Sequence, residues 1–185
     1  TRTVGPLQTC FPYLSRDLLE LAILTGRPPL PFSTLAGLPN GLQKLDIHPM
    51  FGDGPGFFAS LPSGLRYLQL TDAGGSLELS ARNISALPSQ NLRTLKLPKA
   101  HGLTKNKEVS LLPRTLTRLY VPEAGTKLTD ACVDHLPPEL TALSIGAVDW
   151  SEGAINRPPA GICSLQLGEH STVSSANALR LLRGE

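Results

Sequence analysis

A ten-residue motif recurs along the chain, and its regular spacing is the strongest constraint on the fold. The motif reads Leu-Pro-x-x-Leu-x-x-Leu-x-Leu, with another aliphatic residue allowed at the last position. Clear copies occupy residues 38–47, 61–70, 112–121 and 136–145, and looser copies occupy 14–23, 87–97 and 158–167. The anchor of each copy is its first strand leucine, or isoleucine in the last copy: Leu18, Leu42, Leu65, Leu92, Leu116, Leu140 and Ile162. Successive anchors are between 22 residues (140 to 162) and 27 residues (65 to 92) apart, so we expect about seven similar structural units.

Each copy of the motif predicts a short strand that follows a turn. Two aliphatic residues separated by one residue point to the same face of a strand, which buries that face. The proline has no N–H group and a fixed φ, which suits the turn before the strand. An apolar residue also precedes the motif leucine by three positions, as in Ile84 and Leu87. This spacing predicts a short helical or 3-10 turn, and we expect Thr129 and Asp130 to cap such a turn at 129–135.

The predicted fold class is α/β, as a right-handed solenoid with a parallel concave β-sheet and short helical or 3-10 turns on the convex side. No single unit can bury its own leucines, so neighbouring units have to stack. The composition agrees, since 35 of the 185 residues are leucine and only 9 are aromatic. A core built from one aliphatic side chain is typical of a repeated layer. We expect residues 1–185 to form a single domain.

The units resemble leucine-rich repeats over about residues 12–182. Residues 136–146 are similar to the Leu-Pro units of the FNIP-type repeats of amoebae and other protists. Bacterial type III effectors carry a related Leu-Pro element in shorter repeats. The asparagine common in leucine-rich repeats would fall near Met50, Ala73, Ala100, Ala124 and Val148, and it is absent there. We therefore expect no asparagine ladder in the loops.

Three expectations concern the segments outside the motif. Residues 178–182 look like the helical turn of an eighth unit, which indicates a piece of a longer chain. The long interval after Leu65 has room for a short strand at 77–79 on the back of the solenoid. We expect the large aromatic residues Phe51, Phe57, Phe58 and Trp150 to fill the convex-side core. If these aromatic residues are exposed, they would instead mark a second contact surface.

Charge, hydropathy and cysteine content limit where in the cell this chain is expected to act. The formal net charge is only +2, and 17% of the residues are charged. The apolar run at 18–24 is interrupted by Glu20 and is too short to span a membrane. Cys10, Cys132 and Cys163 are odd in number and far apart, which argues against a secreted disulfide framework. We expect an intracellular, cytoplasmic protein.

The outward residues of the predicted strands form the candidate binding surface. Cations and both strand tyrosines gather in the middle units, whereas the last two units carry small, neutral residues. Tyrosine and arginine are favoured at binding hot spots because each buries a large area and keeps a polar group. The candidate partner-binding residues on the concave face are Lys44, Tyr67, Lys96, Arg118 and Tyr120. They predict a protein partner that carries acidic groups; the alternative interpretation is an ordinary solvated sheet face.

Other kinds of site find less support in the sequence. Nucleic acid is disfavoured because the net charge is small and Asp46 interrupts the cationic surface. Cys132 and His135 are three residues apart, but no third group or pocket can be assigned to them. Zinc would need more ligands at closer spacing than these two residues and Cys163 supply. The glycine-rich segment at 52–56 lacks the Gly-Lys-Ser/Thr ending of a phosphate-binding loop. We therefore predict no catalytic residues, no metal and no cofactor.

The predicted function is non-catalytic protein–protein interaction, either as a recognition module or as a structural subunit of a larger assembly. Repeated units create an extended surface that suits a large partner. Two alternatives stay open at this point. The resemblance allows the substrate-recognition part of a ubiquitin-ligase system, since many leucine-rich-repeat proteins have that role beside an F-box or a ligase domain. The chain also fits the binding region of a longer enzyme whose active site lies elsewhere.

Overall fold

The computed structural model describes the greater part of the repeat region. The described residues are 13–24, 30–31, 35, 37–51, 57–72, 78–98, 101–103, 105–123, 128–146, 148–155, 157 and 160–168. The predicted helical turn at 178–182, the glycine-rich segment at 52–56 and Cys10 lie outside them.

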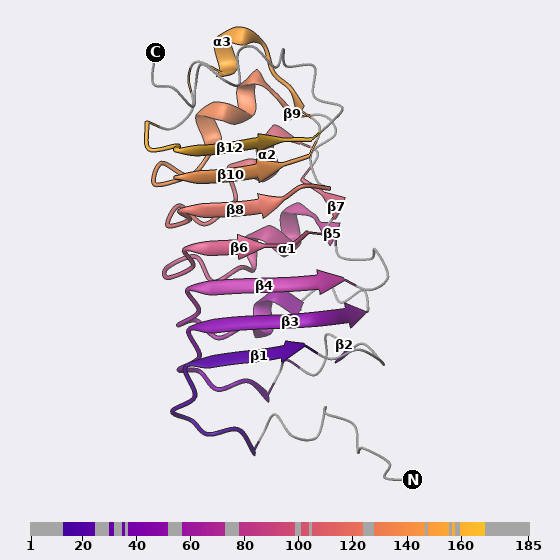
Figure 1. The fold of residues 1–185 in the computed structure, drawn as a ribbon, viewed down its shortest axis with the longest axis vertical. Helices are drawn as coiled ribbons and strands as arrows, with labels where there is room; N and C mark the ends of the chain where they lie inside the picture. Colours follow the sequence, from indigo (N-terminus) through magenta and orange to yellow (C-terminus); the bar gives the residue numbers. More distant parts are fainter. Residues whose placement is uncertain are drawn as a thin grey trace.

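The dominant element is a parallel sheet whose strands follow one another in chain order (Figure 1). Its main path is β1 (Glu20–Leu24), β3 (Lys44–Phe51), β4 (Tyr67–Asp72), β6 (Thr94–Lys96), β8 (Arg118–Val121), β10 (Ala142–Ile145) and β12 (Ser164–Leu167). A further strand, β2 (Leu30–Pro31), pairs in parallel with β3. The expected parallel sheet is confirmed, and each strand of the main path begins two residues after one of the predicted anchors.

The strands pair so that the leucines of the motif lie in rows. Leu45 pairs with Leu68, Leu68 with Leu95, and Leu95 with Leu119. These side chains are buried, and they belong to one continuous hydrophobic core. Strand alternation therefore places the aliphatic residues inward and the intervening residues outward, as the motif predicts.

The Leu-Pro turn has the same hydrogen bonds in successive copies. The carbonyl of Pro39 accepts from the N–H of Leu42 at 3.1 Å, and the Pro62–Leu65 pair repeats this at 3.2 Å. At the start of β8, the N–H groups of Thr117 and Arg118 both donate to the carbonyl of Arg93. The same double donation recurs at β3, β4, β6, β10 and β12. Backbone carbonyls thus link neighbouring copies of the motif at the strand entrances.

Short helices pack behind the sheet, as Figure 1 shows. They are η4 (Phe57–Ser60), α1 (Ala81–Ser85), α2 (Asn106–Val109), η5 (Asp130–His135) and α3 (Glu152–Ile155). Neighbouring helices contact one another along the stack, in the pairs η4–α1, α1–α2, α2–η5 and η5–α3. The predicted short helical turns are confirmed, with Leu87 N–H donating to Ile84 and Leu136 N–H donating to Val133. No described helix has the length and apolar character needed to cross a membrane.

Two small parallel sheets connect the main sheet to the helices. One pairs β5 (Glu78–Leu79) with β7 (His101–Gly102), and the other pairs β9 (Leu128–Thr129) with β11 (Val148–Asp149). The expected strand at 77–79 is present at Glu78–Leu79. Gly102 has φ +90°, and a Cβ atom there would lie 2.9 Å from the backbone nitrogen of Leu79. Glycine is therefore required for this close pairing.

The aromatic and capping predictions have mixed outcomes. Phe58 and Trp150 are buried in the core, as expected, whereas the side chains of Phe51 and Phe57 lie outside the description. Thr129 occupies the N-cap of η5 but makes no side-chain cap bond. Its hydroxyl instead accepts from Asn106 Nδ2 at 2.8 Å, so it links α2 to η5. The capping prediction for Thr129 is wrong because Asn106, 23 residues earlier on α2, supplies a competing donor.

Candidate functional site

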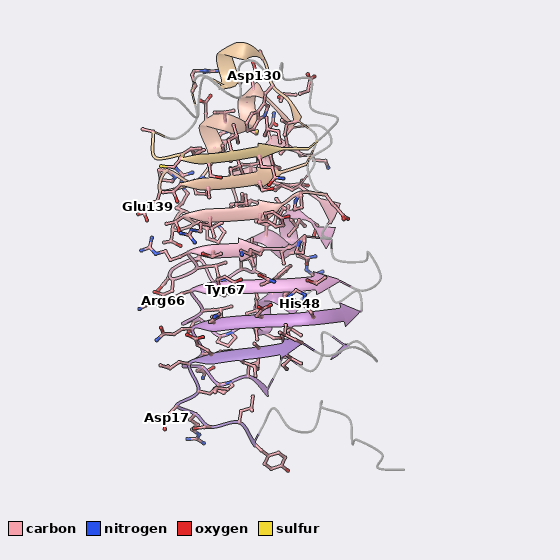
Figure 2. All side chains as sticks on the ribbon, viewed as in Figure 1. Asp17, His48, Arg66, Tyr67, Asp130 and Glu139 are labelled. Carbon is pink, nitrogen blue, oxygen red and sulfur yellow. The ribbon has the colours of Figure 1, made fainter. Side chains whose placement is uncertain are left out.

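All five candidate binding residues lie on the main sheet at outward positions, in two adjacent rows. Lys44, Tyr67 and Arg118 belong to one row, because β3, β4, β6 and β8 pair in register. Lys96 and Tyr120 pair with each other in the next row. Figure 2 shows the polar side chains that accompany these rows, with Tyr67 and His48 in its central part. The placement agrees with the strand alternation, and partner binding by these residues stays a prediction.

Lys44 is engaged within the protein itself. Its Nζ lies 3.1 Å from Glu20 Oε2, an ion pair between β1 and β3. The hydrogen bond and the charge of Glu20 raise the pKa of Lys44 above its ordinary value of 10.5. Both side chains are largely exposed, so the pair stabilises the fold little. Its main consequence is that the charge of Lys44 is already partly neutralised.

Tyr67 lies between two lysines. The Nζ atoms of Lys44 and Lys96 lie 5.8 Å and 5.6 Å from the centroid of its ring. These are cation–π distances, so the ring holds both ammonium groups near the middle of the sheet. The Tyr67 hydroxyl donates to Gln69 Oε1 at 2.5 Å. Tyr67 therefore contacts its neighbours on the sheet and helps to position the two lysine side chains.

His48 is the centre of a polar cluster that the sequence did not predict. Its Nε2 lies 2.8 Å from Asp46 Oδ1 and 2.8 Å from Gln69 Nε2. Its Nδ1 lies 2.6 Å from Thr71 Oγ1 on β4. The β3–β4 register shifts between Ile47 and Met50, beside His48. Such irregularities re-aim side chains, and no simple alternation rule reveals them.

In this cluster the His48 imidazole contacts a hydroxyl (Thr71) through one ring nitrogen and a carboxylate (Asp46) through the other. Nucleophilic catalysis needs this arrangement, but it also needs a pocket and donors for an oxyanion. The three side chains instead lie on the outward face of paired strands, where each already has a partner. We interpret the cluster as a polar brace between β3 and β4.

On this face Arg118 and Tyr120 are exposed, and Lys96 is partly exposed. Tyr120 has 38% of its surface exposed. Among the described residues, no carboxylate forms an ion pair with Lys96 or Arg118. By contrast, Arg93 is paired with Glu139, and Arg157 Nη1 lies 3.9 Å from Asp134. Two cations thus remain without an internal counter-charge in the described face.

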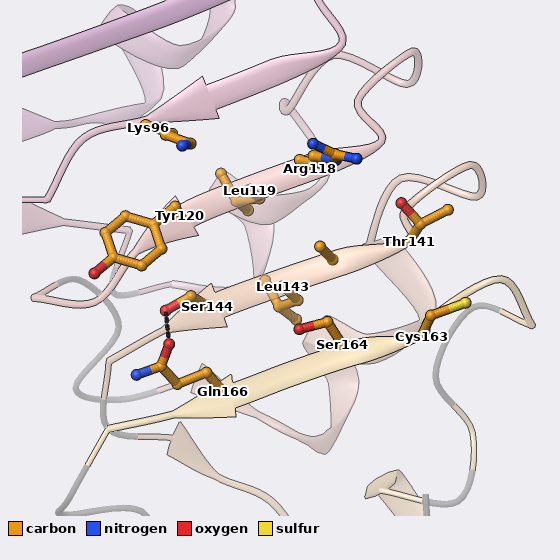
Figure 3. A pocket seen from close by; sticks show the side chains of 11 residues that line it. Lys96, Arg118, Leu119, Tyr120, Thr141, Leu143, Ser144, Cys163, Ser164 and Gln166 are labelled. Carbon is orange, nitrogen blue, oxygen red and sulfur yellow. Dashed lines mark hydrogen bonds between the residues drawn. The ribbon is translucent and has the colours of Figure 1, made fainter. Parts of the chain in front are cut away.

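Small residues beyond Tyr120 create a groove in this face. Its volume is about 540 Å³, and it extends over β8, β10 and β12. We call it the β8–β12 groove; its lining is Lys96, Arg118, Leu119, Tyr120, Thr141, Ala142, Leu143, Ser144, Cys163, Ser164 and Gln166 (Figure 3). Ser144 is only 7% exposed, although alternation places it outward, and Gly146 is also buried. Ser144 is covered because it lies in register between the larger Tyr120 and Gln166.

Cys132 and His135 do not form a reactive pair. Cys132 is fully buried in the core, whereas His135 is exposed. Burial raises the pKa of the Cys132 thiol to about 11, which opposes formation of the thiolate nucleophile. The described residues also contain no group of three His, Cys, Asp or Glu side chains that could hold a metal ion.

The chain was compared with protein-family models, curated sequences and solved structures. No protein-family model matches the chain, and no curated protein sequence matches it. One similar solved structure is the crystal structure of the leucine-rich repeat-containing protein LegL7 from Legionella pneumophila. The likeness has 18% sequence identity and a TM-score of 0.44, and it covers 88% of this chain. The matched region is 59% of the LegL7 chain.

Proposed function

We propose that this chain is a non-catalytic protein-interaction module, built as a right-handed solenoid of seven leucine-rich units. Its binding surface is the outward face of the main sheet, where the side chains of successive strands lie in register. The partner is a protein, and the chain acts as a recognition or scaffold subunit rather than as an enzyme.

One observation carries the proposal. Lys96 and Arg118 stand on adjacent strands without a carboxylate partner among the described residues, next to the exposed Tyr120. Arginine and tyrosine contribute strongly to protein interfaces, because each combines a large contact area with directional hydrogen bonding. By contrast, the charge of Lys44 on the same face is already paired with Glu20.

Affinity capture with the 185-residue chain tests this function. The immobilised chain is expected to retain a defined protein from a lysate of its source organism, identified by mass spectrometry. Substituting both Tyr67→Ala and Arg118→Ala removes the central ring and the guanidinium, so we expect at least a tenfold loss of the captured protein. The identity of the captured partner tests one alternative, because a ubiquitin-ligase subunit would favour substrate recognition.

A matched control removes the same residue types elsewhere. Tyr13 is 87% exposed in the first described turn, and Arg82 is exposed on α1 behind the sheet. Tyr13→Ala combined with Arg82→Ala should leave capture unchanged. Equal losses in both double variants, or none in either, would remove the outward sheet face from consideration.

A further inference from the structure

We propose that the β8–β12 groove binds an extended acidic segment of a protein partner, with two carboxylates placed two residues apart. The inference rests on the proposed function and deepens it, because it names the part of the face that binds and the chemistry that is bound.

The shape of the groove suits a peptide in an extended conformation. Ala142, Ser144 and Ser164 are small, whereas Arg118 and Tyr120 form the wall on β8. Three parallel strands at about 4.8 Å spacing give a floor roughly 10 Å wide, which accommodates one extended chain. The volume of about 540 Å³ corresponds to a short segment rather than to a folded domain.

The charge of the groove selects an anionic occupant. Its lining contains two cations, Lys96 and Arg118, and no acidic side chain. The planar guanidinium of Arg118 can bind a carboxylate through two parallel hydrogen bonds. The Tyr67 ring lies 5.6 Å from Lys96 Nζ and helps to keep this ammonium group over the sheet.

The register of β6 and β8 sets the spacing of the two carboxylates. Lys96 pairs with Tyr120 and Thr94 pairs with Arg118, so the two cations are diagonal neighbours. With about 4.8 Å between strands and about 6.6 Å along two residues, their Cα atoms are roughly 8 Å apart. Alternate side chains of an extended peptide are about 6.6–6.8 Å apart on one side. Flexible lysine and arginine side chains easily make up this difference.

The neutral part of the groove favours a peptide over a nucleic acid. Ser144, Ser164 and Gln166 offer hydroxyl and amide groups, which suit the N–H and C=O groups of a peptide backbone. Ser144 Oγ already donates to Gln166 Oε1 at 3.3 Å, which orients that amide over the floor (Figure 3). A nucleic acid would need a longer cationic track, whereas Asp46 lies on the same face two strands away from Lys96.

An NMR titration of the ¹⁵N-labelled 185-residue chain tests the groove. The probe is a capped pentapeptide with aspartate at its second and fourth positions and glycine or serine elsewhere. We expect saturable amide shifts concentrated on β8, β10 and β12. An otherwise identical peptide with asparagine at both positions should bind at least tenfold more weakly, because it lacks the charges that Lys96 and Arg118 recognise.

Variants of the chain locate the binding. The charge-removing pair Lys96→Gln with Arg118→Gln should weaken the aspartate peptide at least tenfold. Lys107 and Arg82 are exposed on the helices behind the sheet. The control Lys107→Gln with Arg82→Gln removes the same amount of charge and should leave peptide binding unchanged. Ala142→Phe fills the groove without changing charge and should also abolish the shifts. If the phenylalanine in Ala142→Phe disturbs the fold, the Lys96→Gln/Arg118→Gln variant still tests whether the peptide binds through these two charges.

Several outcomes would overturn the groove proposal. Absent shifts, equal binding of the asparagine peptide, or equal losses in the Lys107/Arg82 control each contradict it. Binding of an oligothymidylate in place of the acidic peptide would assign the groove to nucleic acid instead. If protein capture depends on Tyr67 and Arg118 but survives Ala142→Phe, the groove proposal fails while the proposed function stands.

Discussion

At the scale of single residues, burial rather than sequence position decides what each polar group can do. Cys132 on η5 is in the core, whereas Cys163, directly before β12, lines the groove. Likewise, Lys44 and Lys96 both approach the Tyr67 ring, but only Lys44 has a carboxylate partner among the described residues. Two side chains of the same type can therefore differ: one is engaged within the protein, and the other remains accessible to a reagent or a partner.

The two cysteines should differ strongly in reactivity. A thiol with a pKa of about 11 is ionised to roughly one part in a thousand at pH 8, and Cys132 is buried as well. In a Cys10→Ser background, we expect Ellman's reagent to modify one thiol rapidly in the folded chain and the second only after unfolding. Cys163→Ser should remove the rapid phase and Cys132→Ser the slow one. Rapid modification of Cys132 in the folded chain would contradict its burial.

At the scale of elements, side chains one repeat apart hold the short helices in their stack. Asn106 on α2 is hydrogen-bonded to both the hydroxyl and the N–H group of Thr129. Asp130 on η5 accepts from the N–H of Ser151 at 2.7 Å and from its hydroxyl. Helices of four to six residues are too short to be stable alone, so these links and the buried face determine their position.

The Asp130 link should make stability depend on pH. Its hydrogen bonds to Ser151 lower the pKa of Asp130 below the ordinary value of 3.8. A lowered folded-state pKa adds stability above the unfolded value, and this stability is lost as the pH falls through the folded value. We expect Asp130→Asn to lower the melting temperature at pH 7, and the difference should shrink as the pH falls below 3.8.

Thermal unfolding followed by circular dichroism at pH 7 and near pH 3 measures this effect. Glu123→Gln removes one exposed charge elsewhere and serves as the matched control. A melting-temperature difference for Asp130→Asn that is constant with pH would show that the charge of Asp130 does not act through Ser151.

At the scale of the whole molecule, the core is continuous, and each layer contacts mainly its neighbours. The leucines of seven strands pack against one another, so a residue in the middle of the stack has layers on both sides. Leu95 on β6 is fully buried between Leu68 and Leu119, whereas Leu21 on β1 is half-buried. In a stacked architecture, stability is approximately the sum of each layer and its interfaces.

The loss of unfolding free energy caused by a leucine-to-alanine substitution should therefore depend on the position of the leucine in the stack. We expect Leu95→Ala to lower the free energy of unfolding by about 2–5 kcal/mol, the usual range for buried leucines. Leu21→Ala should cost less than about 2 kcal/mol, because part of its side chain already contacts water. Urea unfolding followed by circular dichroism measures both values. Equal costs at the two positions would contradict a core that weakens toward β1.

Much of this architecture follows from the sequence alone. The Leu-Pro motif with its 22-to-27-residue spacing predicted a short strand in each copy, with leucines inward and the intervening residues outward. The strands of the main sheet begin two residues after the anchors. The motif also predicted the short helical turns and the outward positions of the five candidate binding residues. These features are local and periodic, and alternation along a strand is fixed by backbone geometry.

Only the tertiary structure decided which outward side chains meet. Lys44 pairs with Glu20, His48 contacts Thr71, and Thr129 accepts from Asn106. Each contact joins residues that are 23 or 24 positions apart, which is one repeat interval. The groove likewise arises because small residues on β10 and β12 lie beside Arg118 and Tyr120. Such contacts depend on register shifts, side-chain size and competing partners on adjacent strands. A repeating sequence fixes the rows of side chains, but packing across the rows determines which of them remain available to a partner.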